Sequence, residues 1–442
     1  MTKLARTLLC HFCATLIAFI KEIIFSQDFL ERHRLSPNAF TRNRKLPFPV
    51  LIFFLINLIK GSNQDELDGF FQALHDDTIA QRVVSKSALT KARKNLDYKA
   101  FIELNQEAIH FFESHFQPEK WQGFTLVAVD GSTARVPRNE EVAEHFGQWH
   151  PAKGDPCPLA RVSQMFDVLN HVTLDAIISP KKIGERELAA DHFLNLMSKD
   201  LVLMDRGYPA FWLFKLIECQ DAQFCARVKA KSWNVVQSFS KSRKKDQIVT
   251  LKPSISSKEK CREMGIEPDP IQVRLIKVKS ECGDMVILIT SLLDKEVYPY
   301  EIFDQLYHMR WPVEEDYKCM KSRIEIENWS GKSVLSVYQD FHAKVFAKNL
   351  TSMLACSVKP AIEQRCRGRK YPYQINFTQA LSKMKDTIVR LFNRSADVVL
   401  ELIMKLQWLF INTIEPIRLG RKFPRKPKIR PDRFSPPYKR PR

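Results

Sequence analysis

The stretch Phe124-Thr-Leu-Val-Ala-Val-Asp130-Gly-Ser132 indicates the fold class of this 442-residue chain. Its apolar and partly β-branched residues before Asp130 predict a short buried strand, and the Asp-Gly dipeptide predicts a turn directly after it. Leu201-Val-Leu-Met-Asp205-Arg-Gly-Tyr208 repeats the arrangement. One such aspartate is most simply a turn residue. Because α/β sheets bind ligands outside the carboxyl ends of their strands, two of them predict a site.

A third acidic residue lies in the segment from Tyr307 to Lys321. At about 100° per residue, one helix places Tyr307 and Lys321 each within roughly 20° of Glu314, and it places Arg310 within roughly 40°. One carboxylate is then framed by a phenol and two cations, which suits a metal ion beside DNA phosphates. A solvated face with an ordinary Arg310–Glu314 pair is the simpler alternative. Pro312 means that the helix either begins there or kinks.

The motif Tyr-x2-Arg-x3-Glu-x6-Lys in this segment resembles the closing signature of a large family of bacterial insertion-sequence DDE transposases. The motifs around Asp130 and Asp205 resemble the first and second acidic motifs of that family, and the three together span residues 126 to 321. The resemblance implies an α/β fold with a ribonuclease-H-like catalytic core. It also implies that Asp130, Asp205 and Glu314 are the catalytic carboxylates.

The same resemblance implies two Mg²⁺ ions, for which Mn²⁺ can substitute. Three massed carboxylates repel one another, and divalent cations with hard oxygen ligands remove that cost while serving an in-line displacement at phosphorus. Asp130 would bridge the two ions, with Asp205 and Glu314 each holding one. The residues expected to position DNA phosphates around them are Tyr307, Arg310, Lys321 and Arg206.

The basic composition supports a nucleic-acid partner. The chain has 69 Lys and Arg against 50 Asp and Glu, a net charge of +19, and a pI near 9.4. Such an excess attracts polyanions, although it does not by itself separate DNA from RNA or from an acidic membrane surface. The family resemblance implies DNA, as terminal inverted repeats and target DNA, and we expect a homodimer in the DNA complex.

Two apolar runs near the start, Leu8 to Ile20 and Leu46 to Ile59, are shorter than the roughly 20 residues that a membrane-spanning helix needs. Lys21 and Glu22 follow the first run, where a signal peptide would have small residues. Both runs therefore predict buried helices and no membrane. The 10 cysteines fit scattered thiols in a reducing compartment. We expect a cytoplasmic bacterial protein associated with the nucleoid.

Residues 1–120 predict a helical DNA-binding domain, because apolar residues recur there at helical spacing. Within it, Ser85 is a plausible N-cap of a basic amphipathic helix that ends near Leu96. This helix is a candidate recognition helix of a helix-turn-helix unit. A basic solvated face is the alternative, but the resemblance to a family whose amino-terminal region binds transposon ends favours DNA contact. The candidate DNA-binding residues are Lys91, Arg93 and Lys94.

The catalytic domain is expected in two segments, 121–226 and 300–345. Between the two strands that precede the aspartates, the sequence predicts two further strands joined by a turn near Asn170, and then a helix. These elements are predicted over residues 161–170, 171–178 and 185–197. The resulting order of strand, strand, strand, helix and strand is the order that a ribonuclease-H-like core requires.

Residues 227–299 are expected to form an antiparallel β insertion, because the interval between Asp205 and Glu314 is far longer than one crossover needs. Its strands are predicted at 234–239, 247–251, 271–278 and 285–290, with a basic hairpin loop at 241–245. Hairpin-forming members of the family carry an aromatic residue before the last of these strands, where this chain has Met285. Met285 or Trp311 is then the candidate for stacking on a flipped base.

The carboxy-terminal part divides into a helical region at 346–417, which would offer a dimer surface, and a basic tail at 418–442. The tail holds eleven Lys or Arg, one acid and six prolines, a composition that cannot bury a core. It is expected to lie on DNA phosphates, with an idle solubilising tail as the alternative.

The sequence therefore predicts a DNA transposase that binds the inverted repeats of its own element, cleaves at the ends and joins the 3′ hydroxyls to target DNA. One alternative is another metal-dependent nuclease or recombinase on the same core. A second is a catalytically retired transposase that acts as a DNA-binding regulator.

Overall fold

The computed structural model describes residues 3–150, 155–279 and 285–418. The chain divides into two compact units. We call residues 1–118, 134–160 and 318–442 the helical unit, and residues 119–133 and 161–317 the sheet unit. The predicted catalytic segment 300–345 is thus shared between the two. Apart from Arg418, the predicted basic tail lies outside the described residues.

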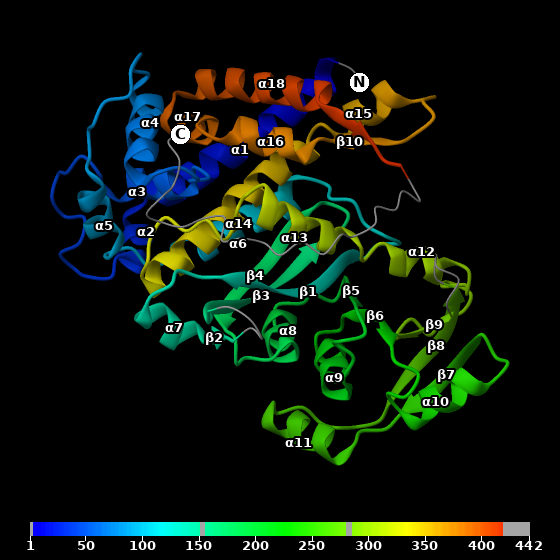
Figure 1. The fold of residues 1–442 in the computed structure, drawn as a ribbon. Coiled ribbons are helices and arrows are strands. Elements are labelled where there is room, and N and C mark those ends of the chain that lie inside the picture. The colour runs from blue at the N-terminus through cyan, green and yellow to red at the C-terminus, as the bar shows by residue number, and fades with distance from the viewer. Residues whose placement is uncertain (1–2, 151–154, 280–284, 419–442) are drawn as a thin grey trace. The chain divides into compact units, whose positions relative to one another are not determined.

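The central sheet has the strand order β2-β3-β1-β5-β6-β9-β8-β7, with β4 pairing β3 (Figure 1). Its first members along the chain are β1 (Thr125–Arg135), β2 (Gln148–Trp149), β3 (Cys157–Asp167), β4 (Val172–Pro180), β5 (Asp200–Met204) and β6 (Gln223–Val228). β1 pairs β5 in parallel and β5 pairs β6 in parallel. The helix α8 (Glu185–Phe193) lies between β4 and β5 in the chain, so the predicted element order β1, β3, β4, α8, β5 is confirmed.

The two aspartates differ in their place on the strands. Asp205 directly follows β5, as predicted. The prediction that the first strand ends at Asp130 was wrong, because β1 continues to Arg135. Only the parallel pairing with β5 stops there, at Val129↔Met204. Asp130 is therefore the first residue of β1 beyond the stretch that pairs with β5, and the following Gly131 continues the strand instead of forming a turn.

The strands predicted as a separate insertion extend the same sheet. β7 (Asp246–Leu251), β8 (Ile271–Lys279) and β9 (Met285–Thr290) pair in antiparallel fashion, and β9 pairs β6. The strand predicted at 234–239 was wrong, since Asn234–Lys241 is the helix α10. Val236 and Phe239, both buried, are three residues apart and fall on one helical face. The remaining helices of this region are α9 (Phe211–Cys219) and α11 (Ile255–Glu263).

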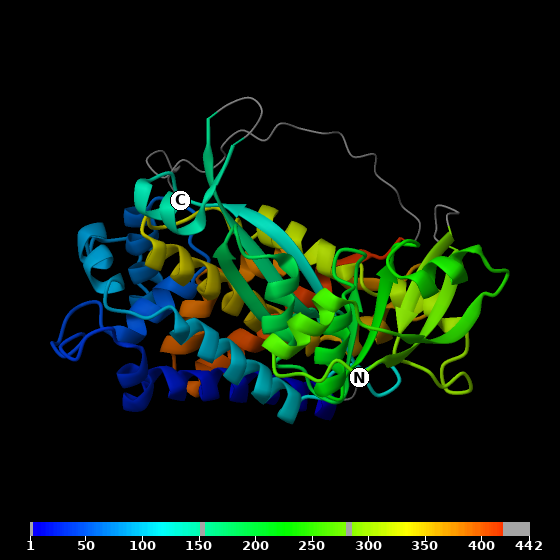
Figure 2. The same ribbon diagram turned by 90° about the horizontal axis from the view of Figure 1, so that it is seen from below.

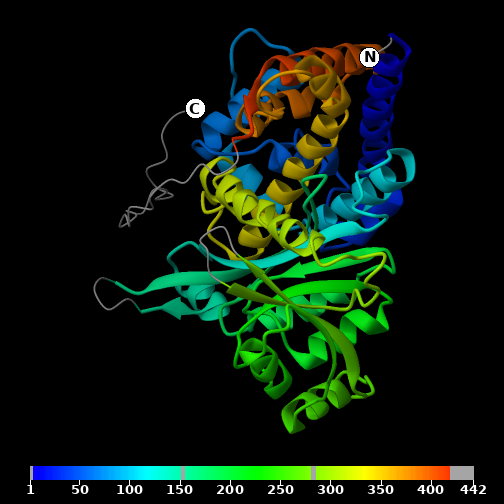
Figure 3. The same cartoon turned by 90° about the vertical axis from the view of Figure 1, so that its right-hand side faces the viewer.

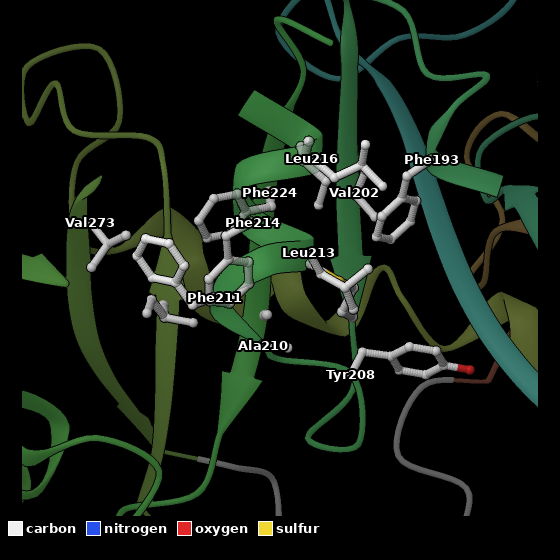
Figure 4. Packing of buried hydrophobic residues seen from close by; sticks show 14 of the residues in the cluster. Phe193, Val202, Tyr208, Ala210, Phe211, Leu213, Phe214, Leu216, Phe224 and Val273 are labelled. Carbon is white, nitrogen blue, oxygen red and sulfur yellow. The ribbon is translucent and has the colours of Figure 1, made fainter. Parts of the chain in front are cut away.

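Alternate residues of the central strands supply two hydrophobic cores. Val127, Val129, Val202 and Met204 belong to one cluster, and Leu126, Ala128, Leu201 and Leu203 belong to the other. Figure 4 shows part of the first cluster, in which Phe214 of α9 stacks on Phe224 of β6 with ring centroids 4.2 Å apart. Because these strands are buried on both faces, their sequences are continuous apolar runs instead of alternating ones.

The segment from Tyr307 to Lys321 forms two helices, α12 (Ile302–His308) and α13 (Pro312–Ser322), instead of one. Pro312 is the first residue of α13, where its missing N–H costs no helical hydrogen bond. Arg310 N–H bonds Tyr307 O at 3.1 Å in the intervening turn. The single helical face predicted from spacing is therefore broken at Met309–Trp311.

The helical unit combines helices from both ends of the chain, although residues 1–120 and 346–417 were predicted as separate regions. α1 packs on α6 and α18, and α14 packs on α3 and α6 (Figures 2 and 3). The helices are α1 (Lys3–Phe25), α2 (Gln27–His33), α3 (Phe48–Ile56), α4 (Asn63–His75), α5 (Lys86–Arg93), α6 (Lys99–His115), α7 (Glu140–Phe146), α14 (Val334–Cys356), α15 (Lys359–Cys366), α16 (Phe377–Met384), α17 (Thr387–Asn393) and α18 (Ala396–Asn412). A small sheet pairs β10 (Tyr373–Ile375) with β11 (Ile414–Pro416).

The two apolar runs near the start form helices with buried side chains, as predicted. The side chains of Leu16, Ile20, Leu51 and Phe54 are fully buried. Across the residues that the structure describes, none of the helices is both long and apolar enough to cross a membrane.

Candidate active site

Asp130 lies half-buried on β1. Burial raises the pKa of its carboxyl to about 6, and the nearby Glu314 and Asp205 carboxylates act in the same direction. The Gly131 N–H, which donates to this carboxylate, and the Arg310 charge oppose the rise. The structure therefore brings the three predicted acids near enough to influence one another electrostatically.

Asp205 is held from α12. The Tyr307 hydroxyl donates to Asp205 Oδ1 at 3.3 Å. Burial raises the pKa of Tyr307, so its phenol remains a neutral donor. Arg206, the next residue in the chain, is exposed. Tyr307 therefore contacts one of the three acids, a contact that the spacing argument did not specify.

Glu314 lies in the first turn of α13, where the helix dipole favours negative charge. Arg310 Nη2 donates to Glu314 Oε1 at 2.5 Å. The guanidinium of Arg310 also lies over the Tyr307 ring, 5.9 Å from its centroid. Arg310 is only 7% exposed, so this cation is part of the interior of the site.

Two further residues of α13 complete the description. Tyr317, which the sequence argument missed, donates its hydroxyl to the backbone oxygen of Asp130 at 2.8 Å and so ties α13 to β1. Its position one turn after Glu314 was the available signal. Lys321 is in the same helix, but it belongs to the helical unit. The structure therefore groups Tyr307, Arg310 and Glu314.

The donor set fits a divalent cation in its chemistry. Three carboxylates offer the hard oxygen ligands that Mg²⁺ prefers, and a cation would relieve the repulsion that helps to raise the pKa of Asp130. Within the described ranges, however, no group of three or more His, Cys, Asp or Glu side chains is arranged to hold one ion. Glu314 has Arg310 as its partner instead.

The candidate recognition helix forms as α5, with the Ser85 hydroxyl accepting from Ala88 N at 3.3 Å. Lys91 and Lys94 are exposed on it. The prediction for Arg93 was wrong, because Arg93 is only 5% exposed. Its guanidinium donates to Asp340 Oδ1 at 2.8 Å. Its other acceptors are Gln339 Oε1, Ser330 Oγ and Ser336 O.

A basic groove lies beside α5 in the helical unit, with a volume of about 1060 Å³. Residues 36–47 form one side and α5 contributes the other. The four cations among its described lining residues are exposed, and no acid lies among them. They are Arg42, Arg44, Lys45 and Lys91. The sequence argument missed residues 36–47, although the run Arg-Asn-Arg-Lys45 was a visible signal.

Both base-stacking candidates have exposed side chains. Met285, the first residue of β9, is 59% exposed, and Trp311 is 44% exposed in the turn before α13. Both side chains are therefore accessible to a base, and their exposure does not favour one candidate over the other.

A family model and two curated relatives match this chain in sequence. The model of the Transposase DDE domain family matches residues 121–350. "Transposase InsG for insertion sequence element IS4" of Escherichia coli (strain K12) is 24% identical over 397 residues, which cover 89% of this chain and 88% of that protein. "Putative transposase InsZ" of the same organism is 23% identical over 179 residues, covering 39% of this chain and 58% of that protein. A cryo-EM structure of the piggyBac transposase synaptic complex with hairpin DNA covers 95% of this chain and 88% of its own, with 12% identity and a TM-score of 0.43.

Proposed function

This chain belongs to the transposase DDE domain family, and on that premise we propose that it is the DNA transposase of an insertion sequence. It binds the terminal inverted repeats, cleaves DNA at the element ends and joins the 3′ hydroxyls to target DNA. One observation carries the proposal. Asp130 and Asp205 follow the paired ends of the adjacent parallel strands β1 and β5, and Glu314 is close enough to raise the pKa of Asp130.

The catalytic core proposed for this activity is ribonuclease-H-like. The strand order β4-β3-β1-β5-β6, with β1, β5 and β6 parallel, supports it. In this view β9, β8 and β7 are an antiparallel insertion that continues the sheet beyond β6.

Asp130, Asp205 and Glu314 would hold the metal, two Mg²⁺ ions for which Mn²⁺ can substitute. When bound, such ions activate the attacking oxygen and stabilise the leaving oxygen. In the first step a water oxygen bonds to phosphorus, the bond from phosphorus to the 3′ oxygen breaks, and that oxygen leaves as a 3′ hydroxyl. In the second step the 3′ hydroxyl attacks a target phosphorus and displaces the target's own 3′ oxygen.

The chain's other residues would position the reacting groups. Tyr307 keeps Asp205 oriented through its hydroxyl. Arg310, buried against Tyr307, holds Glu314 until DNA and metal arrive, and its charge then serves a phosphate. Arg206 is exposed beside Asp205 and would add a phosphate contact, as would Lys321 of α13.

We assign recognition of DNA to the helical unit. The basic groove between residues 36–47 and α5 offers four exposed cations, and Lys94 adds a fifth on α5. Cations in a groove contact phosphates and fix register, while the exposed hydroxyl of Ser87 in the groove is available for base edges. A homodimer would pair the two ends, and the basic tail would add contacts without sequence preference.

A second candidate function is a DNA-binding regulator that has lost catalysis. The Arg310–Glu314 pair favours it, together with the lack of a ready three-acid metal cluster among the described residues.

One experiment separates the two functions. Purified protein is incubated with Mg²⁺ or Mn²⁺ and duplexes carrying the element's ends, with scrambled ends as the matched control. A transposase releases 3′ hydroxyl ends and forms joined products only with the element ends. Selective binding of the ends with no cleavage in either metal would support the regulator and contradict the transposase.

A further inference from the structure

Beside Asp130 lies a group of polar side chains that the proposed reaction does not yet use. Arg161 of β3, Glu185 at the start of α8 and Tyr208 after β5 come together around Gly131. A Cβ added at Gly131 would lie 3.2 Å from both the Glu185 carboxyl carbon and the Tyr208 hydroxyl. Arg161 Nη1 is 3.1 Å from Glu185 Oε1.

Two hydrogen-bond donors in this group lack a partner among the described residues. They are the Tyr208 hydroxyl and Arg161 Nε, both buried. Tyr208 is 2% exposed, and burial, with the Asp130 charge next, raises the pKa of its hydroxyl, so it remains protonated and able to donate. A buried donor without an acceptor is costly, and two of them in one cluster indicate a place where an acceptor binds.

Gly131 keeps open the space beside β1 that the Glu185 carboxylate and the Tyr208 hydroxyl occupy. It has no side chain, and any side chain there would press on Glu185 and Tyr208. The frame around this space is fixed, because Arg186 Nε donates to Gly207 O at 3.0 Å and so ties the start of α8 to the loop after Asp205.

Glu185 lies over this group as a removable acceptor. Its side chain is 49% exposed, whereas that of Arg161 is 23% exposed. A carboxylate and a phosphate present similar oxygens to a guanidinium, and arginine pairs with either. Glu185 therefore holds Arg161 in place and competes with any phosphate that arrives.

We propose that Arg161 and Tyr208 form a phosphate-binding subsite next to Asp130, which takes a non-bridging oxygen of the DNA strand adjoining the scissile bond, and that Glu185 occupies it in the protein without DNA. This inference rests on the proposed function. It assigns the Arg161 cation and the neutral Tyr208 hydroxyl to the edge of the sheet where the carboxylates lie. Without such donors the negative charge of the carboxylates would repel an approaching phosphate.

The test uses the full-length protein and binding in Ca²⁺, so that the strand stays uncut. End duplexes carry a neutral methylphosphonate at the scissile phosphate or at one of its neighbours. Loss of one charged contact should weaken wild-type binding by roughly 10- to 100-fold at one of these positions. At that position Arg161→Ala and Tyr208→Phe should bind the modified and natural duplexes equally well. Fully additive losses at every position would overturn the subsite.

Two further variants make the result specific. Glu185→Gln removes the competitor and should strengthen binding of the natural duplex, in the direction opposite to Arg161→Ala. Glu187→Gln is the matched control on the same helix, since Glu187 accepts from Gly184 N–H and does not contact Arg161 in the described structure. The proposal would also be overturned if Glu185→Gln weakened binding of the natural duplex as much as Arg161→Ala does.

This design separates the subsite from the proposed function. A wild-type protein that binds duplexes but never cleaves them contradicts catalysis, while the coupling between variant and methylphosphonate still tests the subsite. A wild-type protein that binds no duplex overturns both. Unfolding midpoints of the variants accompany the titrations, because a purely structural role would lower stability without coupling to one phosphate.

Discussion

Arg310 donates to Glu314 across the turn that joins α12 to α13, with Nη2 2.5 Å from Oε1. The acid that the family motif assigns to metal binding is thus held by a cation of the same motif. The guanidinium balances the charge of Glu314 in the described structure, and under the proposed function it would become available to a phosphate when Glu314 holds a metal ion.

The three acids should be separable from DNA affinity. Asp130→Asn, Asp205→Asn and Glu314→Gln should each abolish strand cleavage and leave binding of end DNA nearly unchanged, because affinity comes mainly from phosphate contacts elsewhere. Cleavage assays in Mg²⁺ and gel-shift titrations of the same preparations check this. A variant that cleaves at the wild-type rate would remove its residue from the site.

Replacing Arg310 should affect the reaction more than metal binding. Arg310→Ala should slow cleavage or joining on the order of 10²-fold, since a displaced phosphate loses its alignment. Single-turnover rates on uncut and pre-cut ends measure the effect, with Mn²⁺ binding followed separately. Tyr307→Phe is the companion variant, because it removes only the hydroxyl that holds Asp205. Unchanged rates for both variants would contradict the positioning role.

Arg93 should matter for stability and not for DNA. Arg93→Ala removes the guanidinium that pairs with the buried Asp340 carboxylate and should lower the free energy of unfolding by roughly 3 to 5 kcal/mol. Lys94→Ala, the neighbouring exposed residue of α5, is the matched control and should leave stability unchanged while weakening DNA binding. Urea unfolding followed by circular dichroism gives the free energy of unfolding of each variant. Equal stability of the two variants would show that the pair contributes little.

The basic groove and the basic tail should differ in selectivity. Arg42→Ala or Lys91→Ala should reduce the preference for element ends over scrambled duplex, and each should lower the slope of log affinity against log salt by about one. Deletion of residues 418–442 should weaken all duplexes similarly and flatten the slope further. Salt titrations on both duplexes decide the matter. A tail deletion that selectively destroyed end preference would move recognition to the tail.

Local patterns in the sequence determined much of the central fold. The apolar runs before Asp130 and Asp205 predicted the two strands that lie side by side, and the order of β3, β4 and α8 followed from their patterning. Pro312 predicted a start or a kink of the helix at that residue, because proline acts on its own backbone, and α13 begins there. The acids that meet at the site were likewise readable from their motifs.

Other features were decided by tertiary contacts that no local pattern records. β1 continues through Gly131, and there neighbouring Glu185 and Tyr208 leave little room for a side chain. Residues 234–239 form a helix because Val236 and Phe239 find a shared core. Arg93 is buried because it pairs with Asp340, which lies far along the chain.

The sequence by itself determined which residues carry charge, which segments prefer strand or helix, and which acids belong to the motif, because these are properties of single residues and their near neighbours. Only the tertiary structure decided which cations stay exposed, where Arg93 finds its partner, and that β7, β8 and β9 extend the central sheet. Burial and pairing depend on segments distant in the chain, and the free energy of a buried charge depends on what those segments place beside it.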